Sequence, residues 1–201
     1  SSDLNSIAAP DGTVTADKWF EDSNTGVHYI TQSVTIPSNS VVTISIFAKA
    51  GERTRFGLLE PVVNKGAFFD LSNGSFVANF VGAPTSYSIT PVGNGWYRCS
   101  ITVTGSGTTS GSEMYLVSSG TTYNYTGDGT SGIYIWGAQL SVGSIAGDYT
   151  PTTSAAVYGP RFDYDPVTLA AKGLLIEESR SNLAIYSEDF SNASWVKRDR
   201  K

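Results

Sequence analysis

Most of this chain alternates apolar and polar residues with a period of two, and this pattern constrains the fold more than any other feature. Residues 41–49, VVTISIFAK, place four apolar side chains on one side and a mainly polar row on the other. Because successive side chains of a β-strand point to opposite faces, such segments are predicted to be half-buried strands. The same alternation is strong in 27–36, 96–103, 113–118 and 132–140, and weaker in 54–60, 66–70, 75–80 and 85–90.

Turn-forming residues separate these predicted strands. Residues 72–74, 93–95 and 127–129 each combine Asn or Asp with Gly, which is typical of tight turns. The chain has 21 Gly and only 15% charged residues, and no segment shows the amphipathic helical period that an α/β fold needs. We therefore expect an all-β protein folded as an antiparallel β-sandwich or jelly roll.

Composition changes after the Thr- and Pro-rich stretch at 149–153. We expect a β-sandwich domain at 4–150 and a connector at 151–182 that packs on or between modules. The last part, 183–201, has the pattern of the beginning of a folded unit: an apolar run, a polar turn and a Trp.

Charge and hydropathy argue against two classes of partner. The net charge is −5 and the basic residues form no concentrated patch, so nucleic acid is not an expected partner. No apolar run reaches the length of about 18 residues that suggests a membrane span, so membrane insertion is not expected. The single cysteine, Cys99, alternates with apolar residues and is predicted to be a small core residue.

Several segments together resemble the carbohydrate-binding-module-like β-sandwich domains of bacteriophage virion proteins, especially tail and fibre proteins. They are DGTVTADKW (11–19), VGNGWYRCSITV (92–103), YTGDGTSGIYIWGAQLSVGS (125–144) and RFDYDPVT…GLLIEESRSNL (161–183), and the resemblance extends over nearly the whole chain. It implies a concanavalin A-like or carbohydrate-binding-module-like fold, exposed to the extracellular medium on a phage tail or surface appendage.

The function implied by the resemblance is non-catalytic binding of a polysaccharide or cell-surface glycan, whether on a host or in the environment. The rival is a structural or interaction domain of a fibre or tail that binds no sugar. In either case other virion protein modules, or copies of this chain, are expected partners.

The resemblance also places the end of the chain in an unusual order. A stretch like NLAIYSEDFSNASWVK (182–197) resembles the first strand and turn of such a module, yet here it follows the segments that normally come after it. We therefore expect residues 183–197 to supply an edge strand to a sandwich that lacks one. The segment folds back in cis or is donated to a neighbouring molecule; a disordered or independently docked tail is the alternative.

Residue types that carry catalysis are scarce. The only histidine, His28, shares a strand face with apolar residues and is predicted to be a partly buried structural residue. A glycosidase needs two facing carboxylates, and nothing in the sequence selects a pair, so an enzyme is not expected. No cofactor is required, although a structural Ca²⁺ is possible: Asp128 lies among glycines in YTGDGTSG (125–132), where a tight turn is the default interpretation.

Sugar rings stack on aromatic side chains while their hydroxyls bond to polar groups, so outward-facing rings beside charges are candidates for binding. If the strands share a sheet, their alternation forms one platform from Tyr29, Phe47, Lys49, Trp96, Arg98, Glu113 and Tyr115. The alternatives are that the connector covers this face or that the residues are scattered.

Loop aromatics suggest two further sites. Tyr123 and Tyr125 form a second candidate at one end of the sandwich, and Trp19 with Phe20 forms a third. Trp136 shares the alternation of Ala138 and Leu140 and is predicted to point into the core with them.

Overall fold

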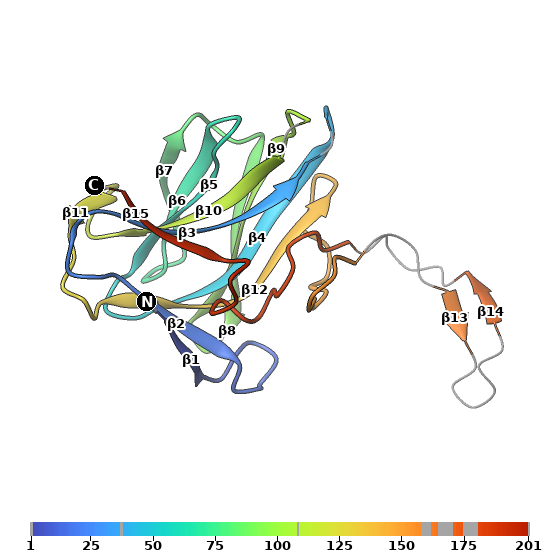
Figure 1. The fold of residues 1–201 in the computed structure, drawn as a ribbon, viewed down its shortest axis with the longest axis horizontal. Coiled ribbons are helices and arrows are strands. Elements are labelled where there is room, and N and C mark those ends of the chain that lie inside the picture. The colour runs from blue at the N-terminus through green and yellow to red at the C-terminus, as the bar shows by residue number, and fades with distance from the viewer. Residues whose placement is uncertain are drawn as a thin grey trace.

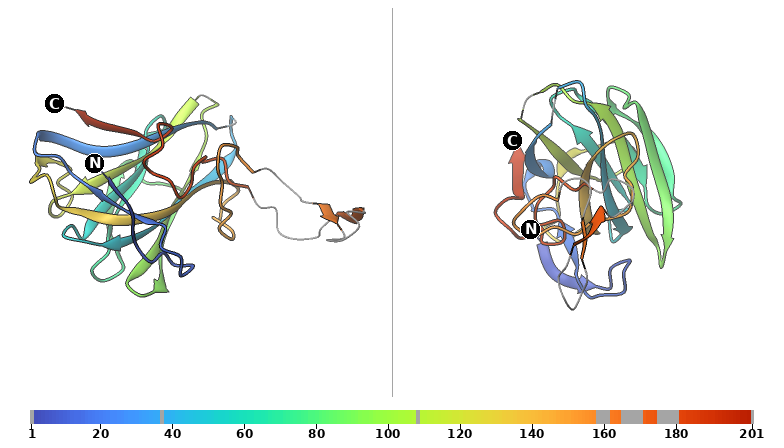
Figure 2. Two further views of the ribbon diagram at one scale, coloured as in Figure 1. Left: turned by 60° about the horizontal axis from the view of Figure 1, so that its bottom comes forward. Right: turned by 90° about the vertical axis from the view of Figure 1, so that its right-hand side faces the viewer.

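The computed structural model describes residues 2–36, 38–107, 109–157, 162–164, 171–174 and 181–200. The described residues form strands and turns and no helix, and the strands build two antiparallel sheets packed face to face (Figures 1 and 2). The predicted all-β antiparallel sandwich is therefore confirmed, while its assignment as a jelly roll stays a prediction.

The first sheet has six strands in the order β1-β2-β12-β4-β9-β8. Their bounds are β1 Ser2–Ile7, β2 Ala16–Phe20, β12 Gly132–Val142, β4 Val41–Ala50, β9 Trp96–Thr104 and β8 Ser86–Gly93.

The second sheet has seven strands: six in the order β11-β3-β10-β5-β6-β7, and β15, which also pairs with β3. Their bounds are β11 Asn124–Thr126, β3 Thr25–Thr35, β10 Thr109–Val117, β5 Arg55–Glu60, β6 Lys65–Asp70, β7 Ser75–Val81 and β15 Val196–Arg200. Two further strands, β13 (Phe162–Tyr164) and β14 (Ala171–Leu174), pair only with each other among the described strands.

The apolar rows of the predicted strands, apart from Trp136 of β12, supply the main core between the two sheets. From the first sheet it includes Ile44 and Ile46 of β4 and Cys99 of β9, and from the second Ile30 of β3 and Phe56 of β5. All of these side chains are almost fully buried. The predicted core position of Cys99 is confirmed, as are the nine segments assigned as strands from their alternation.

The end of the chain is part of the sandwich. We call residues 181–200 the terminal segment. Its strand β15 runs antiparallel to β3 in the same chain (red beside blue in Figure 2), and its turns place Leu183, Phe190 and Trp195 in the main core. The strand thus lies at 196–200, whereas the sequence suggested an edge strand over 183–197. Of the predicted connector, residues 158–161, 165–170 and 175–180 lie outside the described residues.

Candidate functional site

A groove of about 500 Å³ lies on the outer face of the first sheet, over β4, β9 and β8. Hydroxyl side chains dominate its lining, and no Asp or Glu is among the described residues that form it. We call it the hydroxyl groove. It is lined by Thr43, Ser86, Tyr87, Ser88, Thr90, Val92, Arg98, Ser100, Thr102, Ser144, Ile145, Ala146 and Gly147.

The strand register explains why these hydroxyls share a face. Three neighbouring strands place Thr43, Thr102 and Ser86 in one row across the sheet, and Ser45, Ser100 and Ser88 in the next. Each strand is apolar on its inner side, so the outward positions are free to carry short polar side chains. Within the first row the hydroxyls of Thr43 and Thr102 share a hydrogen bond of 2.9 Å.

Arg98 lies in the third row, between Phe47 of β4 and Thr90 of β8. Its Nη1 donates to the carbonyl of Gly147 at 2.5 Å and its Nη2 to the Ser45 hydroxyl at 3.3 Å. Its Cζ lies 5.2 Å from the centre of the Phe47 ring, a cation–π arrangement. Burial lowers the pKa of Arg98 from its usual value, yet a guanidinium stays protonated in proteins, so the groove keeps a fixed positive charge.

Residues 143–147 form one wall of the groove. The Thr43 hydroxyl donates to the carbonyl of Gly143 at 2.9 Å, and the Thr102 hydroxyl donates to that of Ser144 at 3.3 Å. On the other side of the loop, Gln139 Nε2 donates to the carbonyl of Ala146 at 2.5 Å. The wall is therefore held by side chains of three strands, and its shape does not depend on a ligand.

Tyr87 of β8 borders the groove, but its ring points to the inner side of the first sheet. Its register partner is the core residue Ile101, and its neighbours Ser86 and Ser88 point outward. The ring is 47% exposed at the edge of the sandwich and stacks on Phe76 of β7, in the opposite sheet, with ring centres 4.0 Å apart and planes at 12°. Among the described residues, the groove is therefore lined by hydroxyls and Arg98, without a ring on its outer face.

The single platform expected from the alternation is wrong, because its strands do not share a sheet. β4 and β9 belong to the first sheet, whereas β3 and β10 belong to the second. Phe47, Lys49, Trp96 and Arg98 therefore lie on one outer face of the sandwich, while Tyr29, Glu113 and Tyr115 lie on the opposite one. Of these seven residues, Arg98 alone lines the hydroxyl groove.

On the first sheet the two nominated rings are covered. Phe47 and Trp96 are buried in an outer apolar cluster with Trp136, Ala9 and Ala16. The Trp96 Nε1 donates to the carbonyl of Ala8 at 3.2 Å, so residues between β1 and β2 form part of the cover. Lys49 is half-buried and its carbon chain lies close to Gly95.

The prediction that Trp136 joins Ala138 and Leu140 in the main core is wrong. An irregularity in the pairing of β12 with β4 falls between Trp136 and Gln139, and Gly137 within it has φ +62°. One inserted residue reverses the faces of all positions before it. Trp136 consequently points outward, where its Nε1 donates to the Thr15 hydroxyl at 3.0 Å.

On the second sheet the rings pack against one another. Tyr29 stacks on Tyr115 with centres 5.2 Å apart, Tyr115 meets Phe80 edge-on, and Phe80 stacks on Phe68 at 4.3 Å. Tyr123, 36% exposed, lies over this row. The sequence does not single out its neighbours Phe68 and Phe80, because apolar and polar residues alternate only weakly in their segments.

Glu113 lies beside this row and is nearly buried. Its carboxylate accepts the hydroxyl of Tyr115, which stands two residues further on the same face of β10. Tyr29 and Tyr115 are therefore buried. Of the predicted binding residues on this face, Tyr123 is the one whose ring is exposed enough for a sugar to reach.

Tyr125 belongs to a polar cluster at one end of the sandwich. The buried carboxylate of Glu21 receives two bonds from Arg53, one from the Tyr125 hydroxyl at 2.7 Å and one from the Asp128 amide at 2.9 Å. Burial opposes ionisation of Glu21, but these donors outweigh it and lower its pKa. The pKa of Tyr125 is raised, first by burial and second by the hydrogen bond to the Glu21 carboxylate.

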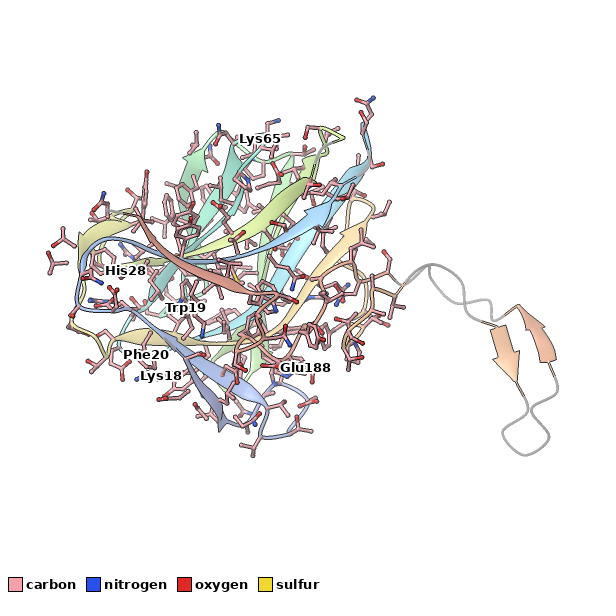
Figure 3. All side chains as sticks on the ribbon, viewed as in Figure 1. Lys18, Trp19, Phe20, His28, Lys65 and Glu188 are labelled. Atoms are coloured by element: carbon pink, nitrogen blue, oxygen red, sulfur yellow. The ribbon has the colours of Figure 1, made fainter. Side chains whose placement is uncertain are left out.

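His28 adjoins this cluster and is buried, as its alternation indicated. Its Nδ1 lies 3.3 Å from a carboxylate oxygen of Asp22, and its ring lies 4.8 Å from that of Tyr125. Figure 3 labels His28 on β3 and Trp19 and Phe20 on β2. Trp19 is a main-core residue, so the third predicted site loses its larger ring, while Phe20 is half-buried.

Asp128 caps its own turn. Its Oδ1 accepts the amides of Thr130 and Ser131 at 2.8 and 2.7 Å and the Thr130 hydroxyl, and its Oδ2 accepts the Ser131 hydroxyl. These bonds lower its pKa. Among the residues that the structure describes, no group of three or more His, Cys, Asp or Glu side chains could hold a metal ion, so the suggested Ca²⁺ site gains no support from such a cluster.

No helix in the described part of the chain has the length and apolar character needed to cross a membrane. In comparisons with known proteins, no family model and no curated protein matches the chain.

Proposed function

We propose that this protein is a non-catalytic carbohydrate-binding module and that the hydroxyl groove is its binding site. The observation that carries the proposal is the groove itself: a cavity of about 500 Å³ whose lining combines eight residues with polar or charged side chains on a rigid sheet. Small-molecule sites in proteins have volumes of about 300–1,000 Å³. The proposed setting is a phage virion protein, for which the sequence resemblance is the support.

The chemistry of the lining suits a polyhydroxylated ligand. Each Ser or Thr hydroxyl both donates and accepts, as a sugar hydroxyl does, and Arg98 adds donors in a fixed plane. Since no carboxylate is among the described lining residues, the pair that glycoside hydrolysis requires is not offered there, which supports binding without cleavage.

Binding at one groove is expected to be weak. Short hydroxyl side chains bury little apolar area, and polar groups exchange water for sugar with small net gain. Affinity in the range of about μM to mM at one site can be raised by orders of magnitude when many copies face the same surface. A module repeated on a virion would meet that condition.

The proposal is tested by a glycan array followed by calorimetric titration of each positive glycan. Ser88 and Thr90, both exposed in the groove, are each replaced by Tyr to fill the cavity. The matched control is Ser33→Tyr, at an exposed strand serine on the outer face of the second sheet. We expect S88Y and T90Y each to weaken binding at least about tenfold and S33Y to leave it unchanged.

Two outcomes contradict the proposal at different levels. Glycan binding that S88Y and T90Y leave unchanged rules out the groove but keeps a glycan-binding function elsewhere, with Tyr123 the next position to test. Failure to bind any glycan on an array of immobilised, closely spaced ligands removes the function itself. Release of reducing ends from a polysaccharide would instead indicate a glycosidase.

The second candidate function is a structural or interaction domain of a fibre or tail. Two observations favour it: β8 is the last strand of the first sheet, and the sandwich completes its core with a segment from the end of the chain. An unpaired strand edge and a segment-binding site both serve protein–protein contacts. A chain that binds no glycan but associates with copies of itself would fit this function.

A further inference from the structure

The terminal segment is held by polar contacts to both sheets. Gln32 of β3 exchanges two hydrogen bonds with the main chain of Ile185, at 2.8 and 2.9 Å. Asp17 of β2 accepts the amide of Phe190 at 3.1 Å. All three bonds join a side chain of the sandwich to the main chain of the segment, so the sandwich presents a specific docking site for it.

Apolar burial shows that the docking site is incomplete without the segment. Leu183, Phe190 and Trp195 belong to the same core as Trp19 and Ile30. Phe190 and Trp195 pack together with ring centres 4.8 Å apart, and both are almost fully buried. An empty site would expose the facing core residues to water, which costs free energy in proportion to the apolar area.

The covalent path to the segment is much longer than its position requires. Val157 and Asn182 exchange both main-chain hydrogen bonds, Val157 N to Asn182 O at 2.9 Å and Asn182 N to Val157 O at 3.0 Å. A turn of about two residues is enough to join such a pair, yet residues 158–181, 24 in all, lie between them. Even with β13 and β14 paired within this stretch, the 11 residues that flank the pair, 158–161 and 175–181, can together span up to about 35 Å. The connection therefore does not determine which copy supplies the segment.

We infer that the docking site also takes the terminal segment of a second copy of this chain, so that two copies exchange residues 181–200. The exchanged segment makes the same contacts in either copy, and the balance is set by concentration alone. A single copy fills its own site in dilute solution, and exchange grows as the local concentration of copies approaches the effective concentration within one chain, on the order of mM. The inference is independent of glycan binding.

The pairing of β15 with β3 offers a chemical test. Thr31 and Val196 are register partners, so a cysteine at each can form a disulfide only when the segment is docked. One full-length chain carries Thr31→Cys and another carries Val196→Cys; they are mixed at about 1 mM, warmed below the unfolding temperature, and oxidised. The native Cys99 is fully buried and its pKa is raised by burial, so it does not compete. Covalent heterodimer is measured by gel electrophoresis without reductant.

The control pair combines Val196→Cys with Thr90→Cys, an exposed position on the distant strand β8. We expect the T31C and V196C pair to exceed this control roughly tenfold, and the excess to fall on dilution. A chain with both T31C and V196C must close an internal disulfide when dilute, which establishes that the geometry permits the bond. If that bond closes while the mixed chains give no more heterodimer than the control, the inference is overturned.

Discussion

Gln32 of β3 binds the main chain of Ile185 with both atoms of its side-chain amide. Nε2 donates to the carbonyl at 2.8 Å, and Oε1 accepts the amide hydrogen at 2.9 Å. The Gln32 side chain is almost fully buried, and the two bonds reproduce one rung of an antiparallel ladder with a side chain in place of a strand. This rung joins residues 153 positions apart.

Replacing Gln32 by Glu is expected to lower the free energy of unfolding by about 2 kcal/mol, because a buried carbonyl loses its donor and faces a carboxylate instead. Urea denaturation at neutral pH measures the change. The neighbouring exposed residue provides the control: Ser33→Ala should alter stability by less than about 0.5 kcal/mol. Equal effects of the two substitutions would show that the amide does not hold the terminal segment.

Gly57 of β5 is expected to tolerate no larger residue. A Cβ at this position would lie 2.9 Å from ring carbons of both Phe68 and Phe80, so Gly57→Ala forces the stacked rings apart at a cost of about 1–3 kcal/mol. Thermal unfolding measures it.

A double-mutant cycle separates this clash from a general loss of strand stability. If the rings are the cause, Gly57→Ala should cost clearly less in a Phe80→Ala background, where one ring is gone. Additive effects of the two changes would contradict the explanation.

The Glu21 cluster is expected to make the fold sensitive to acid. The pKa of Glu21 is lowered below its usual 4.5 in the folded state, so its ionised form contributes stability above pH 4.5 that is lost as the pH falls through the folded value. Glu21→Gln should cost about 3 kcal/mol at pH 7, since it leaves Arg53 without its charge partner. The difference in the free energy of unfolding between E21Q and the parent protein should become smaller below pH 4.5.

The surface pair formed by Lys18 and Glu52 provides a comparison for this measurement. Glu52→Gln removes an exposed ion pair and should cost less than about 1 kcal/mol at pH 7. If the two glutamates proved equally important, the buried cluster would have no special part in stability.

Calcium is expected to leave stability unchanged. The carboxylate oxygens of Asp128 are taken up by Thr130 and Ser131, and a bound ion would have to displace those donors. Addition of about 1 mM calcium, far above the dissociation constant of a tight structural site, should move the midpoint of thermal unfolding by less than about 1 °C. A rise of several degrees that Asp128→Ala abolishes would instead establish a calcium site.

The alternation of apolar residues predicted the strands and the inner core, because a strand with one buried face carries an apolar residue at every second position of its own sequence. Ile44, Ile46 and Cys99 lie where that pattern placed them. The same pattern does not report which strands are neighbours, so Phe47 and Tyr115 were assigned to one platform although their sheets face opposite ways. The pattern also does not reveal a single inserted residue. The insertion in β12 turns Trp136 outward, so its position was predicted wrongly.

The candidate site followed from the sequence only in part. Arg98 was selected by its outward position, but the hydroxyls beside it have no distinguishing sequence pattern, because Ser and Thr are common on the polar face of any strand. They line one groove because β4, β9 and β8 are neighbours in the sheet and the loop at 143–147 forms a wall beside them. Tyr87 shares the inward row of Ile89, and its ring reaches solvent only because β8 is the last strand of the sheet.

The mutual bonds of Val157 and Asn182 have a consequence for engineering. Val157 and Asn182 are paired with each other, so the two ends of the stretch between them lie side by side. An unrelated domain with adjacent termini can therefore be inserted in this stretch while both flanking residues keep their places. A scaffold of this kind would display its cargo at one fixed spot on the surface.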